Sequence, residues 1–122
     1  MLRFKATATT TAFLLYSAGV GASNCVEPTA PSIPEGSTAS YEEMVDTQTA
    51  VKTYQTAMGN FRKCVENHMD SIDEALKEGD KEAAADFLNH NRRFNESVSA
   101  EEQVAQEFNV ALRAYKAANP SQ

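Results

Sequence analysis

Apolar residues recur in alternating steps of three and four between residues 41 and 76, and this spacing constrains the fold more than any other feature of the chain. Read as heptads, the d positions are Met44, Val51, Met58, Val65 and Ile72. The a positions are Gln48, Gln55, Arg62, Met69 and Leu76. Such a period places one edge of a long helix against a second helix, as in a coiled coil. The sequence therefore predicts an all-α fold built on long helices.

The residues that begin and stop helices indicate where two such helices lie. Ser40 and Glu43 match a capping box, so we expect the first helix over residues 41–78. Gly79 supplies a left-handed stop before a second helix over residues 80–118. A tight turn between helices of matched length predicts a long antiparallel two-helix hairpin. The 3-4 series of the second helix is Ala84, Phe87, Asn91, Phe94, Val98, Glu101, Ala105, Phe108, Leu112 and Tyr115.

A three-helix bundle with a break near residues 95–99 is the alternative. That segment has low helix propensity, and Ser99 with Glu102 forms a second possible capping box. We favour the continuous helix because the heptad phase carries through from Phe94 to Ala105 without an inserted residue.

The first 22 residues read as a secretory signal peptide. Arg3 and Lys5 precede an uncharged, moderately apolar segment that ends in Val20-Gly21-Ala22, whose small residues suit a cleavage site. A lipid anchor on Cys25 is not expected, because Asn24 precedes it. We therefore expect an exported protein located in the periplasm, with secretion as the alternative.

Export leaves a strongly acidic chain. Once Arg3 and Lys5 are removed, 9 basic residues face 17 acidic ones, a net charge of about −8. Such a surface repels phosphate backbones and anionic lipid, so the sequence predicts no nucleic-acid partner, and no segment is suited to a membrane span.

Residues 23–40 form an arm that contains Pro28, Pro31 and Pro34, which favour an extended conformation. In an exported chain with two cysteines, a Cys25–Cys64 disulfide is the default pairing, and an intermolecular disulfide is the alternative. The arm is long enough for this bond. Its 15 residues from Cys25 to the helix start span about 46 Å as polyproline II, and the helix from there to Cys64 is about 36 Å long.

The arm also has a predicted surface to cover. In a hairpin that turns at Gly79, facing residues have numbers that sum to about 158, which brings the g positions of the two helices together. These positions are mostly apolar or small, and they are Tyr54, Phe61, His68, Ala75, Ala83, His90, Ser97, Val104 and Ala111. We expect the arm to lie on this flank, with Val26, Pro28, Pro31 and Ile33 over Tyr54, Phe61 and Val104.

The candidate site residues lie on the same flank. His68 and His90 are expected to face each other, with Cys64 four residues before the first and Asp86 four residues before the second. These are ligand types that zinc accepts, but a disulfide removes Cys64 from the set. A metal site, a pH-sensitive histidine pair and ordinary packing remain open as interpretations. We predict no bound cofactor.

No catalytic motif is present in the sequence: it has no glycine-rich phosphate loop, nucleophile elbow or Cys-x-x-Cys pair. We therefore expect a protein that is not an enzyme but a structural or protein-interaction module, with a protein partner or self-association. A small metal-binding protein is the alternative.

Three features together resemble a known group of proteins. They are the Cys-Val-Glu-Pro-Thr-Ala-Pro-Ser-Ile-Pro-Glu-Gly arm at residues 25–36, the Val51-Lys52-Thr53-Tyr54-Gln55 segment with Cys64, and the closing stretch over residues 108–116. This pattern resembles an uncharacterised group of small exported proteins of Proteobacteria. The resemblance implies export and a helical hairpin, and it implies no particular activity.

Overall fold

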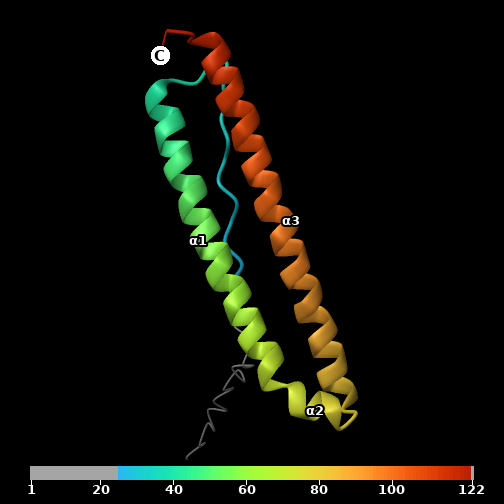
Figure 1. Cartoon of the computed structure of the whole chain (residues 1–122). Helices are drawn as coiled ribbons and strands as arrows, with labels where there is room; N and C mark the ends of the chain where they lie inside the picture. The colour runs from blue at the N-terminus through green and yellow to red at the C-terminus, as the bar shows by residue number, and fades with distance from the viewer. Residues whose placement is uncertain (1–24, 122) are drawn as a thin grey trace, which may run out of the picture.

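The computed structural model describes residues 25–121, which form three helices and contain no β-strand. Helix α1 spans Tyr41–Ser71, α2 spans Asp73–Lys77 and α3 spans Lys81–Ala118. The two long helices, α1 and α3, lie side by side and run in opposite directions, with α2 at the closed end (Figure 1). The predicted all-α fold with two long helices packed together is confirmed. The predicted signal peptide, residues 1–22, lies outside the described residues.

Helix α1 begins with the capping box that the sequence predicts. The Ser40 hydroxyl accepts a hydrogen bond from the Glu43 backbone N–H at 3.1 Å, and the Ser40 N–H donates to the Glu43 carboxylate at 2.6 Å. Two backbone donors that have no partner inside the helix are thereby satisfied. The hydrogen bond from the Ser40 backbone is the main reason that the pKa of Glu43 is lowered from its ordinary value of 4.5.

This cap makes the stability of the protein depend on pH. Because folding lowers the pKa of Glu43, its carboxylate adds stability above pH 4.5 and loses that contribution as the pH falls through the folded-state pKa. We expect Glu43→Gln to lower the melting temperature at pH 7, and the difference from wild type to vanish in acid. Thermal unfolding at a series of pH values measures both. Glu42→Gln is the matched control, because Glu42 lies in the same turn outside the capping box, and an equal effect from both substitutions contradicts the prediction.

The predicted first helix over residues 41–78 is wrong at its end, because the helix is interrupted at Ile72. The Ile72 N–H bonds to the Asp70 carbonyl, whereas in a continuous helix it would bond to the His68 carbonyl. The His68 carbonyl accepts the Ser71 hydroxyl at 2.6 Å, but Ser97 makes the same kind of bond inside a continuous helix, so this bond alone does not explain the break. The chain continues beyond Ile72 as the separate short helix α2.

A left-handed glycine and a side-chain cap make the turn into α3. Gly79 has a φ of 81°, a conformation that residues with a Cβ rarely adopt. Asp80 then accepts hydrogen bonds from the N–H groups of Glu82 and Ala83 at 2.9 and 3.0 Å. The second long helix thus begins where the sequence predicts.

Helix α3 is continuous through residues 95–99, so the alternative of a break there is wrong. The hydroxyls of Ser97 and Ser99 donate to carbonyls of the same helix, those of Phe94 and Asn95. Ser99 therefore does not cap a new helix. A serine bonded in this way is compatible with an uninterrupted helix.

The deepest part of the core lies on the side of the helix pair that faces the arm. The arm runs between α1 and α3 (Figure 1), and Cys25 belongs to the main core cluster while Ile33 packs against it. On α3 every seventh residue is buried on this side, namely Ala83, His90, Ser97, Val104 and Ala111. The 3-4 series of α3 was expected to form the seam, which is the line of contact between the two long helices. Much of this series, such as Phe94 and Phe108, is only half-buried.

Contacts of the arm with α3 are close at one point and loose at another. Gly36 is buried, and a Cβ on it would lie only 1.8 Å from the Ala111 carbonyl oxygen, so the arm backbone touches the helix backbone there. Val26, by contrast, is 82% exposed. Its predicted position over the flank is therefore wrong, because the residue next to the disulfide points away from the helices.

Candidate functional site

The Cys25–Cys64 pair fixes the start of the described arm to the last third of α1. The two cysteines are bonded in the structure, with their Cα atoms 5.6 Å apart, and there is no free cysteine among the described residues. Cys64 is thereby removed from the predicted set of metal ligands, because a disulfide sulfur is not a thiolate.

His68, Asp86 and His90 are brought together next to this disulfide, across the contact between α1 and α3. The Nε2 atom of His68 lies 2.7 Å from Asp86 Oδ2, and the Nδ1 atom of His90 lies 2.8 Å from Asp86 Oδ1. The two imidazole rings have centroids 4.1 Å apart and planes tilted by 33°. A single carboxylate thus accepts from both histidines, one on each of its oxygens.

Hydrogen bonding in the cluster is incomplete. His90 Nδ1 also lies 2.9 Å from the Asp86 backbone carbonyl, and because both of its partners are acceptors this nitrogen carries a hydrogen. The other ring nitrogens, His68 Nδ1 and His90 Nε2, are buried without a hydrogen-bond partner among the described residues. The hydrogen bond from His68 lowers the pKa of Asp86 from its ordinary value of 3.8, against the opposing effect of burial.

Two arginines connect different elements of the fold. Arg93 donates to the Cys25 carbonyl at 2.8 Å, and its guanidinium lies 5.0 Å from the centre of the Phe61 ring. Arg62 forms an ion pair with Glu101 across the seam. The sequence places Arg62 and Glu101 in the heptad series of the two helices, but Arg93 was missed, because no periodic pattern marks an arginine that reaches across to the arm.

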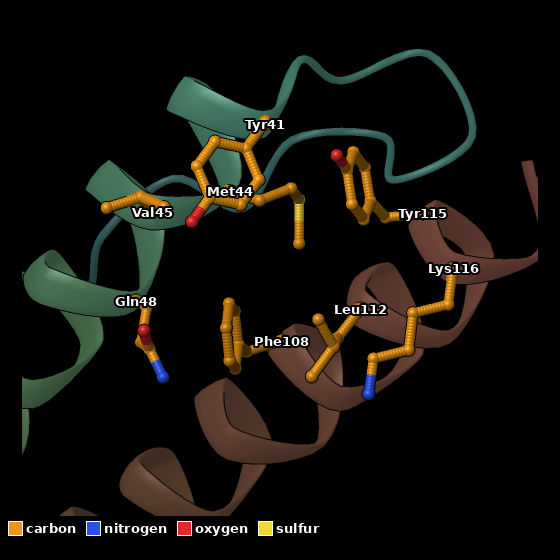
Figure 2. A pocket seen from close by; sticks show the side chains of 8 residues that line it. All are labelled: Tyr41, Met44, Val45, Gln48, Phe108, Leu112, Tyr115 and Lys116. Atoms are coloured by element: carbon orange, nitrogen blue, oxygen red, sulfur yellow. The ribbon is translucent and has the colours of Figure 1, made fainter. Parts of the chain in front are cut away.

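A groove lies between the open ends of α1 and α3. Figure 2 shows side chains from the two helices facing each other across it, and its volume is about 260 Å³. Tyr41 and Val45 at its edge are 67% and 41% exposed. The eight lining residues are Tyr41, Met44, Val45, Gln48, Phe108, Leu112, Tyr115 and Lys116. Most of them belong to the heptad series, which predicted burial in the seam instead of a groove.

No protein-family model, curated protein or solved structure matches this chain. Among residues 25–121, no helix has both the length and the apolar character needed to cross a membrane.

Proposed function

We propose that this chain is an exported, non-catalytic module that acts by binding another protein through the groove at the open end of the helices. In this proposal the mature chain is a coiled-coil-like hairpin with its arm fastened along it, and it works in the periplasm. The signal-peptide pattern of residues 1–22, the disulfide, and the resemblance to small exported proteins of Proteobacteria support export.

The groove is the observation that carries the proposal. Its volume of about 260 Å³ is below the usual range of sites for small organic ligands, which is about 300–1,000 Å³, but it suits one or two apolar side chains. Tyr41 and Val45 leave apolar and aromatic surface exposed beside it, and aromatic residues are enriched where proteins bind each other. Gln48 and Lys116 add polar atoms to the lining. A partner that inserts an apolar side chain fits this chemistry.

Photocrosslinking in exporting cells tests this function. A photoreactive amino acid at position 45 is expected to crosslink to one protein, and the same probe at the exposed position 63 of α1 is expected not to. Replacing Leu112, on the opposite wall of the groove, by aspartate is expected to abolish the crosslink from position 45. The melting temperature of that variant shows whether the fold survives.

Two results would contradict the proposal. One is equal crosslinking from positions 45 and 63, and the other is a crosslink from position 45 that Leu112→Asp leaves unchanged in a folded protein. A crosslinked product of twice the chain mass identifies the partner as a second copy, which sedimentation velocity of residues 23–122 then verifies.

A further inference from the structure

We propose that His68, Asp86 and His90 bind a divalent transition-metal ion such as Zn²⁺. This site goes beyond the protein-binding function proposed above and uses none of the groove residues. Two imidazole nitrogens and one carboxylate oxygen form a ligand set that zinc accepts in proteins, with a fourth position open to water.

The ligand atoms already converge. One atom from each of the three residues can be chosen so that all lie within 4.8 Å of one another. A tetrahedral zinc site with bonds of about 2.0–2.1 Å has edges of about 3.4 Å, so side-chain rotations close the remaining gap. Each histidine already faces a different oxygen of the Asp86 carboxylate, at 2.7 and 2.8 Å. An ion therefore replaces two hydrogen bonds without a rearrangement of α1 or α3.

The burial of the two histidines is the second observation. His68 and His90 are 8% and 5% exposed, yet each keeps one buried ring nitrogen without a partner among residues 25–121. These two nitrogens are not the ones that face Asp86, so an ion held beside the carboxylate leaves them as they are. Burial instead fixes the orientation of both rings, which preorganises His68 Nε2 and His90 Nδ1 for an ion.

Access and charge also favour an ion at this place. The Asp86 side chain is 37% exposed, so an ion can reach its carboxylate from solvent. Arg93, the nearby cation one turn after His90, is engaged by the Cys25 carbonyl and the Phe61 ring. Because two of the three donors are imidazoles, the site is suited to zinc, copper or nickel and not to Ca²⁺ or Mg²⁺, which prefer oxygen ligands.

Calorimetric titration of the oxidised mature chain with ZnCl₂ at pH 7 tests the site. We expect one Zn²⁺ per chain, no heat from CaCl₂ or MgCl₂, and a higher melting temperature with zinc. Asp86→Asn is expected to weaken zinc binding at least about tenfold, and His90→Gln to weaken it further. Asp70→Asn, at an exposed carboxylate of α1, is the matched control and is expected to leave the affinity unchanged.

Nitrogen NMR of the histidine rings provides a readout that does not depend on the variants. Zinc is expected to shift the NMR signal of one ring nitrogen of His68 and of one ring nitrogen of His90 in the wild-type chain.

Two results would overturn the proposal. The first is the absence of heat in the titration together with unshifted ring-nitrogen signals. Zinc affinity equal in wild type and in a folded Asp86→Asn variant would also overturn it, since the ion would then be held elsewhere. The crosslink from position 45 is independent of all these results, so failure of the metal site leaves the proposed function standing.

Discussion

Replacing Cys25 and Cys64 together by alanine is expected to lower the free energy of unfolding by about 4 kcal/mol, according to the chain-entropy model. The bond joins residues 39 apart in the sequence, and opening it frees a loop of that length in the unfolded chain. Native proteins are typically stable by only about 5–15 kcal/mol, so this loss would be a large share of the total. Urea unfolding of the oxidised wild type and of the double variant measures the difference.

The reduced wild-type chain is the matched control for this experiment, because it lacks the bond but keeps both side chains. It is expected to unfold close to the double variant. Cys25 is 6% exposed within the main core cluster. Removing its sulfur therefore slightly weakens core packing in the double variant but not in the reduced wild type. If reduction leaves the urea midpoint unchanged, the arm is held by other contacts and the prediction is wrong.

Gly36→Ala is expected to destabilise the protein by about 2–3 kcal/mol, a value typical of overpacking a buried position. The added Cβ would lie 1.8 Å from the Ala111 carbonyl oxygen and 2.6 Å from its carbon. These are backbone atoms of α3, which cannot move aside as the end of a flexible side chain can. The arm must therefore lift away from the helix around residues 33–39. Urea unfolding measures the loss.

Gly59→Ala is the matched control for Gly36→Ala, because it makes the same chemical change in the interior of α1. No atom lies within 4 Å of a Cβ built at Gly59. This substitution is expected to stabilise the protein by up to about 1 kcal/mol through helix propensity. Opposite signs at the two positions would show that the arm backbone lies against α3, and stabilisation at both would contradict that contact.

Much of the helical architecture could be predicted from local signals. The 3-4 spacing, the Ser40–Glu43 capping box and Gly79 each act within a few residues, so the sequence shows them directly. The interruption at Ile72 was missed because no glycine or proline marks it, and the bond of the Ser71 hydroxyl to the His68 carbonyl has a counterpart at Ser97 inside the continuous helix α3. Periodicity gives a stripe of apolar residues but does not reveal a local break in the backbone.

Part of the candidate site could be predicted from the sequence, because the position of the turn sets which residues of the two helices face each other. Counting residues from the turn at Gly79 placed His68 opposite His90, and their rings lie 4.1 Å apart in the structure. The two buried ring nitrogens without partners could not be predicted, because partners come from the packing of all neighbouring side chains. The groove at the open end was also missed. The heptad pattern assigns Phe108 and Leu112 to the contact between the two long helices and does not show that this contact opens at the helix ends.

The position of the disulfide divides the described chain into two parts that are held together differently. Both cysteines precede the turn at Gly79, so the covalent loop contains the arm and most of α1 but no residue of α3. Apart from the backbone of the turn that joins it to α2, helix α3 is held by noncovalent contacts alone, including the Arg93 hydrogen bond to Cys25 and the Arg62–Glu101 ion pair. Partial unfolding therefore has a preferred order, in which α3 detaches as one unit while the arm stays linked to α1. The same asymmetry permits two chains to exchange their α3 helices, as in a domain-swapped dimer, without breaking any covalent bond.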